Sequence, residues 1–100
     1  MSTFGKRLKV ARLAADLSQE QLGVQAGIEE ASASARMNRY EKGTRAPAIE
    51  IVQRIASVLG VPVSYFFSEH DDEAELLLAF HRMSGEQRKR LLRSVHAHAR

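Results

Sequence analysis

The stretch SQEQLGVQAGIEEASASARMNRYEKG, residues 18–43, decides the fold because it carries the start and stop signals of two short helices. Ser18 can accept a hydrogen bond from a free backbone N–H, and Gln21 stands three residues later, where its amide can reach back to the cap. Gly27 ends the first helix, since glycine adopts a positive φ without steric cost. Two helices separated by a glycine turn give the outline of a helix-turn-helix.

The second helix of the pair is expected over residues 32–42. Placed at 100° per residue, Ala33, Met37 and Tyr40 fall on one side, with Glu41 beside them and pointing inward. The remaining arc carries Ser32, Ala35, Arg36, Asn38 and Arg39, with Ser34 close by. Small residues allow a close approach to the major groove of DNA, and Arg and Asn can pair bidentately with guanine and adenine edges. A plain solvated helix face would have the same composition.

Several blocks then follow one another in a specific order. They are Ser18-Gln19-Glu20-Gln21-Leu22, Ala26-Gly27, Arg39-Tyr40-Glu41-Lys42-Gly43, Pro47 and Leu59-Gly60-Val61. These blocks resemble the five-helix DNA-binding domain of the phage repressor and Cro family, also called the xenobiotic-response-element type. The match covers about residues 4–67. The resemblance implies an all-α, lambda-repressor-like fold, double-stranded DNA as the partner, and a recognition helix that enters the major groove.

The chain departs from that family between Gly27 and the Tyr40-Glu41 pair, where it carries about four residues more than is usual. Either the turn is longer or the recognition helix begins earlier. The two alternatives differ in which of Ser32, Ser34 and Ala35 first meets a base.

Residues next to the recognition helix are expected to hold the DNA backbone. Gln19 stands at a helix N-terminus, where backbone N–H groups favour an anion, and the resemblance implies that it contacts a phosphate. Lys42, at the end of the recognition helix, and Thr44 and Arg45, in the loop after it, can reach the backbone of the duplex. Such contacts position a protein on DNA without reading its sequence.

A first helix is expected over residues 3–15, with two apolar rows that both need cover. The rows are Phe4, Leu8, Ala11 and Ala15, and beside them Val10, Leu13 and Leu17. Its solvated or phosphate-facing charges are expected to be Lys6, Arg7 and Lys9. Arg12 lies on the inward arc instead, and the resemblance implies a structural ion pair between Arg12 and Glu41.

Two further elements should complete the core. Residues 48–59 show the spacing of a buried helix that Gly60 ends. Residues 61–67 are expected to form a short fifth helix with Pro62 in its first turn. Its aromatic side chains, Tyr65, Phe66 and Phe67, are interpreted as packing residues rather than as a surface for stacking bases.

The remaining residues predict a helical tail. After a polar break at residues 68–72, one helix carries the apolar stripe Leu76, Leu77, Phe80 and Met83, and the next carries Leu91, Leu92 and Val95. We expect a helical hairpin, residues 69–100, attached to a DNA-binding domain, residues 1–68. A hairpin cannot bury both stripes on its own, so it should pack on the five-helix body or on a second chain as a dimerisation element.

Composition limits the class of protein. One hundred residues with 44% hydrophobic residues indicate one small folded domain, and no apolar run approaches the ~20 residues of a membrane span. The first residues lack the apolar core of a secretory signal, which predicts a cytoplasmic protein. Without cysteine, disulfides and thiolate metal sites are excluded. The net charge of +3 is unevenly distributed: residues 1–45 carry eight Lys or Arg against five acids, residues 69–81 carry five acids and no Lys or Arg, and residues 82–100 carry six Lys or Arg against one acid. The basic front of the chain suits a polyanion.

No pattern of residues predicts catalysis or a metal site. The histidines lack an evident partner set, and the acids at residues 71–75 accompany no nucleophile or phosphate loop. We therefore predict a sequence-specific DNA-binding transcriptional regulator, a repressor that works as a homodimer on an operator and needs no cofactor. The alternative is an antitoxin or protein-interaction adaptor whose C-terminal helices bind a partner protein.

Overall fold

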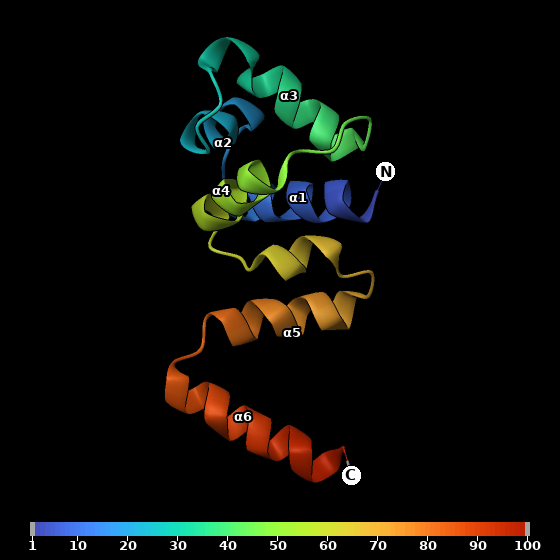
Figure 1. Ribbon diagram of the computed structural model, residues 1–100, viewed down its shortest axis with the longest axis vertical. Coiled ribbons are helices and arrows are strands. Elements are labelled where there is room, and N and C mark those ends of the chain that lie inside the picture. Colours follow the sequence, from blue (N-terminus) through green and yellow to red (C-terminus); the bar gives the residue numbers. More distant parts are fainter. Residues whose placement is uncertain (1, 100) are drawn as a thin grey trace.

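The computed structural model describes residues 2–99, which contain six α-helices, one 3₁₀ helix and no strand (Figure 1). The elements are α1 (Thr3–Ala14), α2 (Gln19–Gln25), α3 (Glu30–Lys42), α4 (Ile49–Leu59), η1 (Val63–Phe67), α5 (Asp71–His81) and α6 (Gly85–His98). The first five elements form a body, α5 lies along the side of the body at η1, and α6 leads away from it (Figure 1). The predicted all-α class, with five elements and a two-helix extension, is confirmed.

Local signals place the two helices of the central stretch. Ser18 accepts a hydrogen bond from the backbone N–H of Gln21, and the Gln21 side chain accepts one from the backbone N–H of Ser18, so the predicted capping box is complete. Gly27 and Gly43 have φ values of +88° and +78°, which only glycine adopts readily. These glycines turn the chain after α2 and α3.

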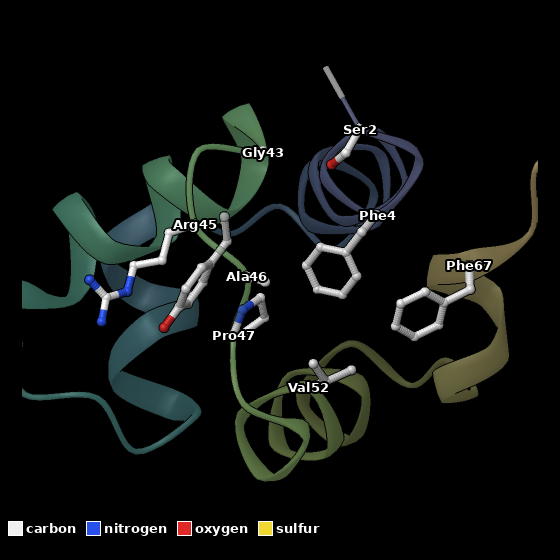
Figure 2. A pocket seen from close by; sticks show the side chains of 9 residues that line it. Ser2, Phe4, Gly43, Arg45, Ala46, Pro47, Val52 and Phe67 are labelled. Atoms are coloured by element: carbon white, nitrogen blue, oxygen red, sulfur yellow. The ribbon is translucent and has the colours of Figure 1, made fainter.

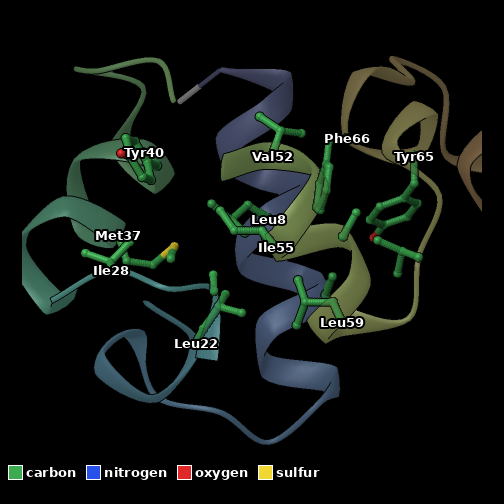
Figure 3. Packing of buried hydrophobic residues seen from close by; sticks show 14 of the residues in the cluster. Leu8, Leu22, Ile28, Met37, Tyr40, Val52, Ile55, Leu59, Tyr65 and Phe66 are labelled. Carbon is green, nitrogen blue, oxygen red and sulfur yellow. The ribbon is translucent and has the colours of Figure 1, made fainter. Parts of the chain in front are cut away.

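The core collects apolar side chains from every element between α1 and η1 (Figure 3). Its largest fully buried side chains are Tyr40, Phe66, Leu8, Leu22, Met37 and Ile55. The angle between α2 and α3 depends on a close approach at Gly23, where an added Cβ would lie 2.7 Å from the Cβ of Ala33. The absence of a side chain at Gly23 thus fixes how α3 is presented.

Helix α3 begins at Glu30, two residues before the predicted start at residue 32. The turn is confined to residues 26–29, so the additional residues lengthen the helix and not the turn. No side chain caps this helix: Glu29 is the N-cap residue and makes no capping hydrogen bond. Burial of Ile28 and of Ala33 sets the start instead, which is a tertiary effect that capping signals do not record.

Helix α1 corrects three expectations. It ends at Ala14, so Ala15 is its C-cap and is exposed. Val10 and Leu13 are at least half exposed, so the second apolar row lacks the cover that was expected. Arg7 is buried rather than solvated. Its Nε donates to the carbonyl oxygen of Ser68 at 3.0 Å and its Nη1 to Asp71 at 2.9 Å, partners more than sixty residues away in the chain.

The fifth element is shorter and tighter than predicted. It is a 3₁₀ helix, and Pro62 precedes it as an extended N-cap residue instead of lying in the first turn. Tyr65 and Phe66 are buried, and Phe67 is exposed although its ring stacks at 5.6 Å from that of Phe4. The aromatic residues therefore pack among themselves, as predicted.

The tail is not a closed hairpin. Helix α5 docks on the body through the buried Ala74 and the partly buried Leu78, whereas α6 buries no residue. The two helices meet at residues 81–85 and diverge as a V (Figure 1). The radius of gyration is consequently 15.2 Å, against roughly 13 Å for a compact chain of this length.

Candidate nucleic-acid interface

Helix α3 has one buried side and one free side. Ala33, Met37, Tyr40 and Glu41 face the body and are buried. The opposite side carries the exposed residues Ala31, Ala35, Arg39 and Lys42. In Figure 1 this helix lies at the end of the molecule farthest from α6, so the tail does not cover it. A helix with small residues near its start and cations near its end is therefore available to a partner.

The other predicted base-contacting residues lie on the flanks of this free side. Ser34 is exposed, and Ser32 and Asn38 are half-buried. Ser32 Oγ donates a hydrogen bond to the carbonyl oxygen of Glu29 at 3.4 Å, which ties it to the first turn of α3. Ser34 and Asn38 lie on the flank nearer Glu41, and Ser32 on the opposite one.

Arg36 is held against its own helix. Its Nη2 donates to the hydroxyl oxygen of Tyr40 at 2.9 Å, and its guanidinium carbon lies 5.9 Å from the centre of the Tyr40 ring. Tyr40 is buried and belongs to the inward side of α3. Arg36 is therefore placed at the edge of the free surface, whereas Arg39 projects from its centre.

A buried ion pair joins α1 to the end of α3. Arg12 Nε and Nη2 donate to the two carboxylate oxygens of Glu41 at 2.6 and 3.1 Å, and Arg12 Nη1 donates to the carbonyl oxygen of Leu17 at 2.9 Å. Gln19 Nε2, from the start of α2, donates to the same carboxylate at 3.2 Å. One carboxylate thus holds α1, α2 and α3 in a fixed arrangement, and the amide nitrogen of Gln19 is already engaged.

The loop after α3 carries the remaining predicted phosphate contacts. Thr44 Oγ1 donates to the carbonyl oxygen of Arg39 at 3.3 Å, so its hydroxyl caps the helix end. Lys42 and Arg45 are exposed. Figure 2 shows Arg45 extending away from Phe4 and Phe67, which line a half-open apolar pocket of about 230 Å³ behind the loop.

The cations of this region are free of intramolecular partners. Within residues 2–99, no carboxylate lies within 4.0 Å of the side-chain nitrogens of Arg39, Lys42 or Arg45. By contrast, the guanidinium groups of Arg7 and Arg12 form ion pairs within the protein, with Asp71 and Glu41. These three unpaired cations lie at the end of α3 and in the loop that follows it, where an anionic ligand would meet them without displacing a salt bridge.

The sequence reasoning missed Ala31, which the earlier helix start brings onto the free side of α3. The pair Glu29-Glu30 is compatible with a first helical turn, where acids are favoured, but it does not fix the residue at which the helix starts. The Arg36 to Tyr40 contact was also missed, although the two residues are four apart and share a helix flank.

The described part of the chain has neither a cluster of metal-binding side chains nor a membrane-spanning helix. Between residues 2 and 99, no three His, Asp or Glu side chains gather where they could hold a metal ion. None of the helices formed by these residues is long and apolar enough to cross a membrane.

Known proteins share this sequence pattern. A helix-turn-helix family profile matches residues 8–66. Two uncharacterised HTH-type transcriptional regulators, from Sinorhizobium medicae (strain WSM419) and Rhizobium meliloti (strain 1021), are each 37% identical over 65 residues, which is 65% of this chain and 44% of the relative. The cryptic phage CTXphi transcriptional repressor RstR of Vibrio cholerae is 31% identical over 68 residues, 68% of this chain and 58% of RstR. This chain spans about half the length of these curated relatives.

A solved structure extends the likeness to the tail. The crystal structure of the transcriptional regulator BswR superimposes with a TM-score of 0.87 at 42% sequence identity, and the match covers 93% of this chain and 92% of BswR. The shared region must therefore include much of α5 and α6, beyond the helix-turn-helix match. With the free face of α3, these similarities show that the chain belongs to the helix-turn-helix family of DNA-binding transcriptional regulators.

Proposed function

We propose that the protein is a cytosolic repressor that inserts α3 into the major groove of an operator, binds as a homodimer, and acts by occupying DNA rather than by catalysis. The observation that carries this proposal is the uncovered side of α3, with Ala31 and Ala35 near its start and Arg39 and Lys42 near its end. Small side chains admit the helix to the groove, and the cations meet base edges and phosphates there.

Base reading is assigned first to Arg39 on the free side, with Ala35 and Ser32 nearest to it around the helix and Asn38 and Ser34 on the flank toward Glu41. Replacing Arg39 with alanine should reduce discrimination at one operator position by about 1–3 kcal/mol, the usual worth of a bidentate pair. Equal loss of affinity for operator and random DNA would instead assign Arg39 to a phosphate.

Arg36 was predicted to read bases, and its contact with Tyr40 favours a different role. We assign Arg36 to contacts with the phosphate backbone beside the groove. Lys42, Thr44, Arg45 and Gln19 at the start of α2 are assigned the same role. Arg36→Ala should then weaken binding to all sequences alike and lower the slope of log affinity against log salt by about one. A change in the preferred sequence would return Arg36 to the base-reading set.

Selection of binding sites from random duplexes, at two salt concentrations, tests the whole proposal. We expect an enriched site made of two half-sites whose centres lie about 34–36 Å apart, one turn of DNA. Salt dependence without any enriched sequence would contradict specific recognition.

The sign of regulation needs a separate experiment. RstR is named a transcriptional repressor, which favours the same sign here. In vitro transcription from a promoter that overlaps the selected site should fall as the protein is added. A rise in transcript would identify an activator.

A further inference from the structure

The V formed by α5 and α6 has apolar inner faces. At its vertex, Arg88 Nε donates to the carbonyl oxygen of Phe80 and Nη2 to that of His81, both at 3.0 Å, and the guanidinium carbon lies 4.9 Å from the centre of the Phe80 ring. Residues three, four and seven positions after Arg88 share its side of α6, so this side faces α5. Those residues are Leu91, Leu92 and Val95.

The facing side of α5 is also apolar. Leu76 and Phe80 are four residues apart in α5, on a side of the helix different from the Ala74 and Leu78 side that docks on the body. Met83 follows in the turn between α5 and α6. The V is open, so both inner faces remain in contact with water: Leu76 is 51% exposed, Leu92 44% and Val95 45%.

An empty V does not account for the order of α6. The helix has 14 residues and buries none of them, and a helix of this length is marginal in water without tertiary packing. The match to BswR over 93% of the chain nevertheless gives the tail a defined place in a solved relative. The apolar stripe of α6 thus has no packing partner within residues 2–99.

We propose that α6 of a second copy of this chain fills the V, and that the exchange is reciprocal, so that α5 and α6 of both copies form a four-helix bundle. The inference rests on the homodimer of the proposed function and names its interface. A two-fold interface brings the same patch together from both copies, and the apolar stripe of α6 is of the kind that the V lacks. Antiparallel bundles are built from helices with such stripes.

Charge selects this arrangement over a contact between the two α6 helices alone. Helix α5 carries Asp71, Asp72, Glu73 and Glu75 and no Lys or Arg, whereas α6 carries Arg88, Lys89, Arg90 and Arg93 against Glu86. Asp71 is paired with Arg7 and Glu73 accepts a hydrogen bond from Ser68, so Asp72 and Glu75 are the acids of α5 that remain for a partner helix. Exchange places the basic helix of one copy beside the acidic helix of the other, and direct pairing of two basic helices would oppose like charges. Within the V the only charged side chain on the apolar stripe of α6 is Arg88, whose Nε and Nη2 are bonded to carbonyl oxygens.

The proposed interface leaves the DNA-binding surface free. The V lies at the end of the molecule opposite α3 (Figure 1). Both recognition helices of the dimer would therefore remain exposed, which two half-sites require.

Light scattering coupled to size exclusion tests the interface with three variants. Val95→Glu places a charge on the inner face of α6, Leu76→Glu does so on the inner face of α5, and Ala97→Glu places the same charge on the outer face of α6 as a matched control. Wild type should elute with twice the chain mass of 11.2 kDa. Each inner-face variant should raise the dimer dissociation constant by roughly 1000-fold, because the substitution occurs twice across the two-fold axis. Ala97→Glu should remain dimeric.

Three results would overturn the interface. A wild type that is monomeric at micromolar concentration would leave the V to a different partner protein, and inner-face variants that dimerise like wild type would place the interface elsewhere. Dissociation by Val95→Glu without dissociation by Leu76→Glu would indicate pairing of the α6 helices alone. Helical circular dichroism and the urea midpoint of each variant check folding, and these should match wild type at low concentration because the replaced residues are exposed in the single chain.

A DNA-binding experiment with the same variants separates this inference from the proposed function. Val95→Glu should bind an isolated half-site as wild type does and should lose the tighter binding to the complete site. A dimer that dissociates as predicted but never binds DNA specifically would refute the proposed function alone. Specific binding by a dimer that the inner-face variants do not disturb would refute the interface alone.

Discussion

Replacing Glu41 with alanine removes the carboxylate that joins α1, α2 and α3. The Arg12 side chain is only 10% exposed and that of Glu41 4%. Without Glu41, Arg12 keeps one hydrogen bond, to the carbonyl oxygen of Leu17, and its charge remains in the protein interior. Breaking a buried pair by removing one partner costs about 3–5 kcal/mol, because the other charge is left uncompensated.

That cost is large for a chain of 100 residues. Small domains unfold with free energies of about 5–15 kcal/mol, so Glu41→Ala should remove about a fifth or more of the stability. A loss of 3 kcal/mol corresponds to a fall in melting temperature of roughly 12 °C or more for a domain of this size. The free energy of unfolding is measured from urea titrations followed by circular dichroism, with an unchanged m-value as the sign that two-state behaviour persists.

Two further variants make the reasoning refutable. Glu75→Ala removes an exposed carboxylate from α5 and should change the unfolding free energy by less than about 0.5 kcal/mol. The double variant Arg12→Leu/Glu41→Leu removes both charges and should be more stable than Glu41→Ala, since no buried charge is stranded. If Glu41→Ala costs under about 1 kcal/mol, or if the double variant is no more stable than Glu41→Ala, the ion pair is not the structural tie described above.

Three other perturbations have clear signs. Gly5→Ala should destabilise the protein by about 1–3 kcal/mol in urea titrations, because an added Cβ would lie 2.1 Å from the backbone oxygen of Glu41. Gly85→Ala, where nothing lies within 4 Å, should instead raise the free energy of unfolding by about 0.4–1 kcal/mol, and a loss there would show that the site is crowded. The hydrogen bond from Arg7 holds the pKa of Asp71 below 3.8, so stability from this contact is present above that pH and is lost as the pH falls through the lower pKa of the folded protein. Between about pH 5 and pH 2, the urea midpoint of Asp71→Asn should fall less than that of wild type, because the variant has no Asp71 carboxylate to protonate. Identical plots of urea midpoint against pH for variant and wild type would contradict the assignment.

The recognition surface shows which side-chain positions local sequence can predict and which it cannot. Arg39 lies on the free side of α3 as the helical spacing predicted, because the buried residues Met37, Tyr40 and Glu41 fix the rotation of the helix. The position of Arg36 did not follow from the same spacing. Its rotamer is set by a hydrogen bond to Tyr40, and a helical wheel gives direction without contacts.

The roles of the two buried arginines were not equally predictable. The Arg12 to Glu41 contact was expected from the resemblance to a family. Arg7 was expected to be solvated, and its burial depends on Ser68 and Asp71, which the chain brings to α1 only after α4 and η1 have packed. A basic residue on a helix gives no sign of which distant carbonyl or carboxylate will meet it.

The sequence by itself determined the helix ends that are set by local interactions. These are the capping boxes at Ser18 and Ser84 and the left-handed turns at Gly27 and Gly43. These helix ends depend on hydrogen bonds within three residues or on the backbone freedom of one residue, so they can be predicted without knowledge of the fold. Only the tertiary structure decided the start of α3 at Glu30 and the open V of the tail. The first depends on burial of a neighbouring residue and the second on which apolar stripes find cover, and both are properties of surfaces that residues distant in the chain build together.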